Sequence, residues 1–135
     1  MVLQYGNFLL FHPAFVHFPI AFYFFETGLL VVWIRTGNEA YWRFAAMVLG
    51  WGYFFMLLSM LTGLANAGGF KGLTGNVAVH FYWALALFGF YTFHLASLWR
   101  TGPRACRRFF HLGASVFGNA LVALTAYCGG ILVYS

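Results

Sequence analysis

Charged side chains are scarce in this chain of 135 residues, and acidic side chains are almost absent. Seven Lys and Arg residues and two Asp and Glu residues make up 7% of the sequence, whereas 63% is hydrophobic. Soluble domains carry charge on about a quarter of their residues, so the composition excludes an ordinary soluble domain. A mean hydropathy of +0.82 instead indicates an integral membrane protein without a separate soluble module.

Motifs of soluble catalysis are missing as well. The two cysteines, Cys106 and Cys128, form neither a C-x-x-C redox pair nor a C-x-x-C-H motif for covalent haem attachment. Because we expect them at opposite membrane faces, a disulfide between them is excluded. The sequence has no phosphate-binding loop, no nucleophile and base constellation and no metal motif of recognised spacing. It therefore favours a non-catalytic subunit over an enzyme.

Four apolar stretches are long enough to cross a bilayer as helices. They cover about residues 14–34, 44–65, 77–99 and 110–134, and each reaches the ~20 residues that span a ~30 Å hydrocarbon core. Only short connections separate them. The sequence predicts an all-α membrane protein in which residues 1–135 form a single domain, a four-helix transmembrane bundle with up-down-up-down topology.

The basic residues predict the orientation of this bundle. The first and third connections hold six of the seven Lys and Arg residues, and the second holds only Lys71. Positively charged loops stay on the cytoplasmic side, so we expect periplasmic termini and a multi-pass location in the bacterial inner membrane. Topology thus accounts for the net charge of +5. The expected partners are the lipid bilayer and other membrane protein subunits, with no nucleic acid.

Histidines are the most informative polar residues within the predicted spans. His80 and His94 lie in the third span, and their separation corresponds to ~1400°, close to four whole turns, and to ~21 Å of rise. Both therefore leave the same helix face, one near each membrane surface. Alternating helix directions then predict that His17 lies near His80 at the outer end and His94 near His111 at the cytoplasmic end. Ionisable groups in such positions usually face a bundle interior, a cavity or a cofactor.

These two pairs predict one or two sites for haem b. A low-spin haem b needs two neutral imidazoles on facing helices, a slot lined by small residues, and apolar walls. Stripes of small residues at helical spacing are present. The candidate ligands of the haem iron are His17, His80, His94 and His111, and the outer pair is favoured. His12 is expected at the membrane surface and is only a further candidate.

Glu26 is the only acid within a predicted span. A bare carboxylate at this depth is costly, so we expect Glu26 to be protonated, or hydrogen-bonded to another subunit or to a tyrosine such as Tyr53 or Tyr127. Transporters and proton channels usually have several intramembrane carboxylates or an interrupted helix pair. A single carboxylate therefore disfavours these classes.

The segment His12–Ile20 reads H-P-A-F-V-H-F-P-I, and it is followed by Thr62-Gly63, by His80 and by a final Gly-Gly-Ile-Leu-Val-Tyr. These features resemble a widespread bacterial family of small four-helix membrane proteins of unknown function with an H-P-x-x-V-H-F-P-I signature. The resemblance covers most of the chain and implies a four-span fold. Some members are joined to Rieske iron–sulfur domains, which implies electron transfer. Family members often place an acid after the Thr-Gly pair, whereas this chain has Asn66.

The leading hypothesis is a membrane-embedded, b-type cytochrome-like electron-transfer subunit of a larger respiratory or photosynthetic complex. An electron-carrier protein or a quinone would be a further partner. One alternative is a cofactor-free structural or accessory subunit, for which 18 Phe, 8 Tyr and 5 Trp residues provide contact area. Another is a pigment-binding subunit, in which a single histidine ligates a chlorophyll magnesium. Paired histidines favour haem over pigment.

Overall fold

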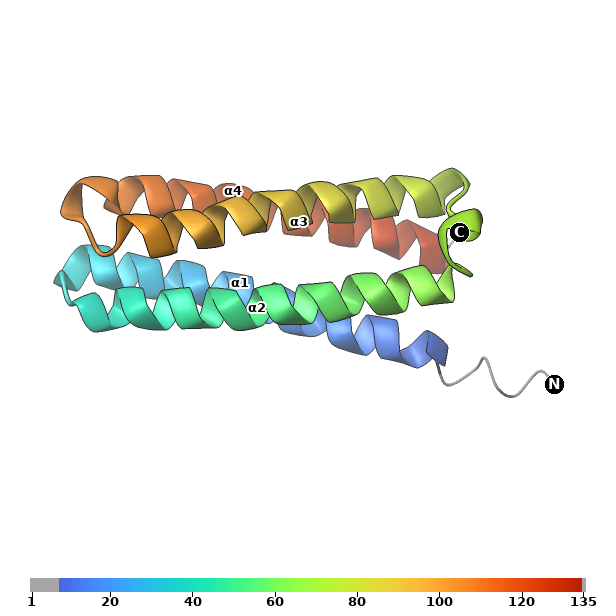
Figure 1. Ribbon diagram of the computed structural model, residues 1–135, viewed down its shortest axis with the longest axis horizontal. Coiled ribbons are helices and arrows are strands. Elements are labelled where there is room, and N and C mark those ends of the chain that lie inside the picture. Colours follow the sequence, from blue (N-terminus) through green and yellow to red (C-terminus); the bar gives the residue numbers. More distant parts are fainter. Residues whose placement is uncertain (1–7, 135) are drawn as a thin grey trace.

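The structure, a computed structural model, describes residues 8–134 and the side chains of residues 12–132. The long helices run side by side in alternating directions (Figure 1). The elements are α1 (Phe8–Thr36), α2 (Glu39–Asn66), the short 3-10 helix η1 (Phe70–Gly72), α3 (Gly75–Thr101), the short 3-10 helix η2 (Ala105–Arg107) and α4 (Arg108–Tyr134). The predicted all-α four-helix bundle is confirmed. Each predicted span lies within one helix, and α1 begins several residues before the predicted start.

All four helices are long and apolar enough to cross a membrane. The candidate spans are His12–Thr36, Glu39–Asn66, Gly75–Thr101 and Ala105–Leu132. Large apolar and aromatic side chains remain exposed on the bundle, among them Trp99, Phe109 and Tyr127. A surface helix of a soluble protein would turn such side chains towards its core. The exposed aromatic surface is therefore suited to contact with lipid.

Tight turns join the helices within each half of the bundle. Gly37 has a φ of 70°, a conformation that favours glycine, and Asn38 then caps α2 by accepting a hydrogen bond of 2.9 Å from the Ala40 N–H. Gly102, with a φ of 61°, ends α3 in the same way. Both turns lie at one end of the bundle.

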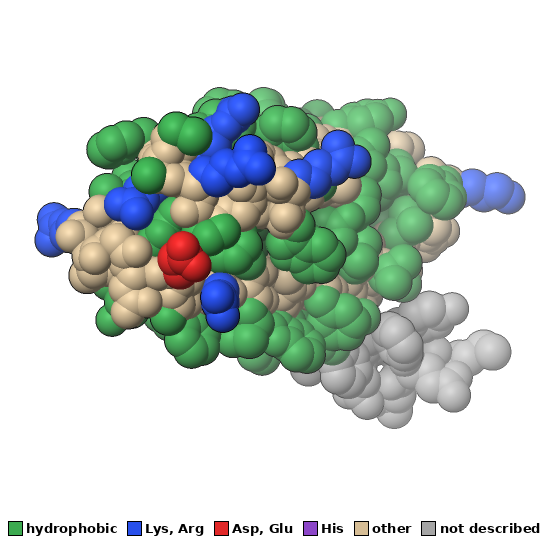
Figure 2. Space-filling model, turned by 60° about the vertical axis from the view of Figure 1, so that its left-hand side comes forward, with side chains coloured by type: hydrophobic (Ala, Val, Ile, Leu, Met, Phe, Trp, Pro, Cys, Tyr) green, Lys and Arg blue, Asp and Glu red, His purple; other side chains and the backbone are tan. Residues whose placement is uncertain are grey.

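The two ends of the bundle differ in charge. The arginine end consists of the α1–α2 and α3–α4 connections and the adjoining helix ends, where the following arginines are exposed: Arg35, Arg43, Arg100, Arg104 and Arg107. Figure 2 shows Lys and Arg side chains gathered over this end. The terminal end consists of the start of α1, the end of α4 and the α2–α3 connection with exposed Lys71. The charge separation is thus a property of the fold, and its orientation in the membrane stays a prediction.

The core lies midway between these ends. Helices α1 and α2 form one closely packed hairpin, and α3 and α4 form the other. The rings of Tyr23 and Tyr91 stack between the hairpins, with centroids 3.6 Å apart and planes at 10°. Apolar side chains surround this stack: Leu49, Met56, Leu87, Leu98 and Val122. The core separates two polar sites, one towards each end of the bundle.

Candidate cofactor site and buried polar cluster

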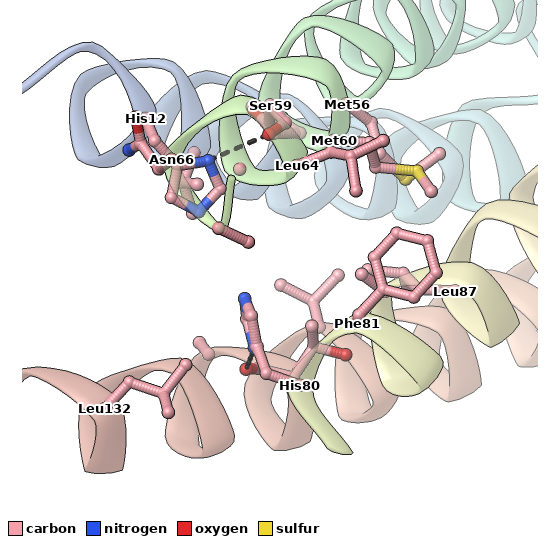
Figure 3. Close-up of a pocket in the computed structure, with 18 of the residues that line it drawn as sticks. His12, Met56, Ser59, Met60, Leu64, Asn66, His80, Phe81, Leu87 and Leu132 are labelled. Atoms are coloured by element: carbon pink, nitrogen blue, oxygen red, sulfur yellow. Dashed lines mark hydrogen bonds between the residues drawn. The ribbon is translucent and has the colours of Figure 1, made fainter. Parts of the chain in front are cut away.

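Two histidines face one another across a cavity near the terminal end. His12 belongs to α1 and His80 to α3, and their ring centroids are 6.4 Å apart with planes at 78°. Figure 3 shows the two rings on opposite walls, each with a ring nitrogen directed into the cavity. We call this pair of histidines and its cavity the outer site. It contains His80, as predicted, but the partner of His80 is His12.

Each of these imidazoles is held by a backbone carbonyl. His12 Nδ1 lies 2.8 Å from the Ser59 carbonyl oxygen, and His80 Nδ1 lies 3.1 Å from that of Thr125. A carbonyl oxygen can only accept, so Nδ1 carries the proton in both rings. The Nε2 lone pair of each neutral imidazole is then available to a metal. Hydrogen bonding of the distal ring nitrogen is the usual way in which proteins orient metal-ligating histidines.

A glycine on the neighbouring helix makes room for each ring. A Cβ atom added at Gly63 of α2 would lie 2.8 Å from the His12 ring, and one added at Gly129 of α4 would lie 2.9 Å from the His80 ring. Such distances are shorter than van der Waals contact. Each ring therefore packs against bare backbone, which restricts its position.

The cavity between the two rings has a volume of about 270 Å³. It lies between the α1–α2 and α3–α4 hairpins and extends from the two histidines towards Tyr23 in the core. Its walls are mostly apolar, with flexible side chains from three helices: Met56, Met60, Leu64, Phe81, Leu87 and Leu132. The site thus combines two imidazoles with mostly apolar walls.

His17 does not take the place predicted for it opposite His80. It is exposed, and its Nδ1 lies 2.5 Å from the carbonyl oxygen of Pro13 in its own helix. Five residues turn a helix by ~500°, so His12 and His17 leave α1 ~140° apart and only one can face the interior. The prediction was wrong because α1 begins at Phe8, which places His12 inside the helix.

The predicted inner pair is brought together towards the arginine end. His94 of α3 and His111 of α4 have ring centroids 6.1 Å apart with planes at 50°, and neither ring has exposed surface. Both Nε2 atoms are already engaged. His94 Nε2 lies 3.0 Å from Glu26 Oε1, and His111 Nε2 lies 2.8 Å from Thr101 Oγ1. This arrangement is a hydrogen-bonded cluster and not an open pair of axial ligands.

The partners of Glu26 differ from those expected. Its carboxylate accepts hydrogen bonds from His94 and from the Ser115 hydroxyl. Tyr53 instead bonds Thr92 at 2.9 Å, and Tyr127 is exposed. The expectation that Glu26 bonds either tyrosine was wrong, because both lie on other helix faces.

The hydrogen bonds of this cluster continue along α1 and α4. Thr27 Oγ1 lies 2.5 Å from Ser115 Oγ and accepts a bond of 2.6 Å from Asn119 Nδ2. Asn119 Oδ1 accepts a bond of 3.4 Å from the Tyr91 hydroxyl. Sequence reasoning missed the roles of Thr27 and Asn119. A usable signal was the spacing of His111, Ser115 and Asn119, each four residues after the last on one face of α4.

Among residues 12–132, no group of three or more His, Cys, Asp or Glu side chains is placed to hold a metal ion. A bare metal ion in the outer cavity would therefore have only two histidine ligands, fewer than the three or four that protein metal sites usually provide. A haem iron needs only two, because the porphyrin supplies the other four nitrogens. The donor set of the outer site fits haem better than an isolated metal ion.

Comparison with known proteins places the chain in a family. Residues 10–135 match the family described as Predicted membrane protein (DUF2231). The chain belongs to this family. The matched range contains all five histidines and Glu26, and the family description agrees with the multi-pass membrane location indicated by the four helices. Neither curated proteins nor solved structures gave a match.

Proposed function

We propose that this DUF2231 protein is a b-type cytochrome-like electron-transfer subunit that holds one haem b between His12 and His80. The observation that carries the proposal is the pair of carbonyl-anchored imidazoles facing one another across an apolar cavity. When bound, a haem supplies one-electron transfer chemistry. The protein binds and orients it and keeps water away.

The spacing of the two rings is compatible with both histidines holding one haem iron. An iron atom bonded to two imidazole nitrogens at about 2 Å each would hold the ring centroids roughly 6 Å apart. The separation between His12 and His80 is 6.4 Å. Their 78° interplanar angle is compatible with this, because rotating either ring about its own metal–nitrogen bond leaves that bond unchanged.

The cavity walls support a flat apolar ligand. At about 270 Å³, the cavity is slightly smaller than the ~300–1,000 Å³ range of ligand pockets. Haem binding there would displace partly buried side chains such as Met60 and Leu64. Methionine and leucine side chains between two hairpins can move more readily than backbone, and methionine adapts well to irregular spaces.

Two further considerations concern the role of the subunit. The motif at His12–Ile20 resembles that of relatives joined to Rieske domains, which favours a place in a respiratory or photosynthetic electron-transfer complex of the bacterial inner membrane. The exposed aromatic surface offers room for other membrane subunits, and an electron-carrier protein or a quinone is the expected redox partner. The proposal assigns no haem to His94 and His111, because their Nε2 atoms are engaged.

The test measures haem retained by purified variants. Reduced-minus-oxidised absorbance spectra, normalised to protein, are compared for the wild type and for His12→Ala, His80→Ala and His17→Ala. We expect the first two substitutions to remove at least nine-tenths of the haem b signal and His17→Ala to leave it unchanged. His17 is the matched control, because it lies on the same helix as His12 but is exposed.

A haem-loaded wild type whose loading survives both His12→Ala and His80→Ala would refute the proposed ligands. Wild-type protein without haem, purified from cells that load other b-type cytochromes, would favour the cofactor-free structural subunit. A magnesium chlorin in place of haem would favour the pigment-binding subunit.

A further inference from the structure

The buried cluster towards the arginine end plays no part in the proposed haem binding and needs its own explanation. Glu26 of α1, His94 of α3 and His111 of α4 have no exposed surface, and neither has Ser115, which donates to Glu26. Glu39, the chain's other acid, is exposed at the start of α2. Three helices thus bring the one intramembrane acid together with two histidines in a space closed to water.

The hydrogen bonds determine which ring nitrogens carry protons. The Thr101 hydroxyl donates to the Ser97 carbonyl at 2.8 Å, so its oxygen accepts from His111 Nε2. In the same way, Glu26 Oε1 is an acceptor when ionised, so His94 Nε2 donates to it. Both imidazoles therefore carry hydrogen on Nε2.

The opposite nitrogen of each ring has no partner. His94 Nδ1 and His111 Nδ1 are buried, and neither forms a hydrogen bond within the part of the chain that the structure describes. If both rings are neutral, two bare lone pairs lie in a low-dielectric interior beside a carboxylate. A buried polar atom without a hydrogen bond destabilises the folded state. A proton bound to one of the two Nδ1 atoms would remove one of these bare lone pairs.

We propose that Glu26, His94 and His111 form an intramembrane proton-binding site that takes up one proton on an Nδ1 atom of the histidine pair. The proton comes from water at the arginine end, an N–H bond forms at Nδ1, and no electron is transferred. The resulting imidazolium pairs with the Glu26 carboxylate, so uptake converts a net negative cluster into a neutral one. The carboxylate attracts the proton, and the second imidazole is a nearby acceptor for it.

The surrounding charges act on this site from each packed helix. Tyr23 of α1 and Tyr91 of α3 lie on the core side, and Arg107 of η2 and Arg108 of α4 lie on the side of the arginine end. The Arg108 guanidinium lies over the Trp33 ring at 5.3 Å, and Arg107 lies over Phe110 at 5.8 Å.

Helix α2 contributes two tyrosines near this part of the bundle. Tyr53 bonds Thr92, and Tyr41 packs against the cluster of Leu30, Trp33 and Ala45. Glu26 is thus the anion that favours uptake, and the two arginines oppose it.

The route to water is short on the arginine side. Thr101 is the last residue of α3 and is only half-buried, and His111 lies in the first turn of α4. The Thr101–His111 hydrogen bond therefore connects the surface of the connection with the buried pair. Towards the core, the chain of Ser115, Thr27 and Asn119 leads away from Glu26.

The experiment is a pH titration of the full-length protein in lipid bilayers, followed by solid-state NMR of ¹⁵N-labelled histidine. His94→Gln and His111→Gln assign the two buried rings, and His17→Gln removes one exposed histidine as a control. In the wild type we expect Nε2–H signals from both rings at alkaline pH and loss of the bare Nδ1 signal with growth of an imidazolium signal on acidification. Glu26→Gln should abolish that imidazolium signal, because it removes the compensating charge, whereas Ser115→Ala should retain it.

Two results would overturn the proposal. One is a wild-type spectrum in which His94 and His111 stay neutral over the whole pH range in which the protein is folded, as expected if their Nδ1 atoms only bind a buried water. The other is an undiminished imidazolium signal in Glu26→Gln. The wild-type titration decides the matter even if Glu26→Gln does not fold, and haem loading does not enter either result.

Discussion

Glu26 joins three helices through its two carboxylate oxygens. Oε1 accepts from His94 of α3, and Oε2 accepts from Ser115 of α4. Hydrogen bonds to an ionised acceptor are about twice as strong as neutral ones. Because all three side chains are buried, water cannot replace a bond that is lost.

Replacement of Glu26 by alanine should therefore destabilise the bundle. The change leaves two buried donors without an acceptor and creates a cavity, and we expect a loss of about 3–5 kcal/mol in the free energy of unfolding. Glu26→Gln keeps the volume and one acceptor oxygen, so its loss should be at most half as large. Equilibrium unfolding of the purified protein in mixed micelles measures both values.

Glu39→Ala is the control for this comparison. Glu39 forms an exposed pair with Arg43 at 3.9 Å, and exposed pairs contribute about 0–1 kcal/mol. Equal losses for Glu26→Ala and Glu39→Ala would show that the buried hydrogen bonds do not hold the helices together.

Residue spacing predicted part of the two sites. The sequence separation of His80 and His94 correctly predicted that both lie on one face of the helix, because each residue turns an α-helix by about 100°. The choice between His12 and His17 depended instead on where α1 begins, and helix ends are set by local context that composition does not reveal. The acceptors Ser59 and Thr125 are backbone carbonyls. Every residue has such a group, so no sequence pattern marks them.

Helix α4 contains a matched pair of adjacent glycines that tests the outer site. A Cβ at Gly129 would lie 2.9 Å from the His80 ring, whereas a Cβ at Gly130 would meet nothing within 4 Å. Gly129→Ala should displace the His80 imidazole and lower the haem content at least threefold. Gly130→Ala should bind as much haem as the wild type. Haem per protein is measured by absorbance after purification. Equal haem loading of the two variants would contradict the packing of the His80 ring against Gly129.

The same helix offers a comparison for packing near the core. A Cβ at Gly118 would lie 2.7 Å from the Tyr91 hydroxyl oxygen, while one at Gly113 would meet nothing within 4 Å. Gly118→Ala should cost about 1–3 kcal/mol of unfolding free energy, because overpacking displaces a ring stacked on Tyr23. Gly113→Ala should be neutral or stabilising by up to about 1 kcal/mol, because alanine favours the helix. Thermal unfolding of both variants in the same detergent compares them, and destabilisation by Gly113→Ala alone would refute the packing described here.

Element boundaries illustrate what hydropathy can and cannot predict. The four spans were predicted because a bilayer demands long apolar helices, and this demand is visible in composition. The cavity was not predictable, because it depends on how far the α1–α2 hairpin stands from the α3–α4 hairpin. That separation follows from side-chain packing at Tyr23 and Tyr91, which periodicity alone does not specify.

At the scale of the whole molecule, charge separates the two ends of the bundle. The arginines of two connections lie at the arginine end, and Lys71 lies at the other end. The positive-inside rule therefore predicts a cytoplasmic arginine end and periplasmic termini. Cys106 provides a probe of this orientation, because it is exposed in the α3–α4 connection.

We expect Cys106 to react with a membrane-impermeant thiol reagent only after the cytoplasmic membrane has been opened. Cys106→Ser reports any labelling of the half-buried Cys128. Labelling of Cys106 in cells with an intact inner membrane would reverse the orientation and place the proposed proton site on the periplasmic side.

The histidines His12 and His80 at one end of the bundle and His94 and His111 towards the other belong to two separate sites, with the stacked tyrosines of the core between them. The outer site has paired imidazoles with accessible lone pairs, and the inner cluster has imidazoles that donate to other side chains. The same residue type therefore serves two chemistries, because the hydrogen-bond partners differ. We propose that haem binds at the outer site.

The most direct test of that claim is the electron paramagnetic resonance spectrum of the oxidised, purified wild-type protein. Two neutral imidazoles on one haem iron produce a six-coordinate low-spin ferric centre. We predict a low-spin ferric haem signal in the wild type and its loss in both His12→Ala and His80→Ala. A wild-type spectrum without ferric haem, or with only a high-spin signal, would contradict ligation by His12 and His80.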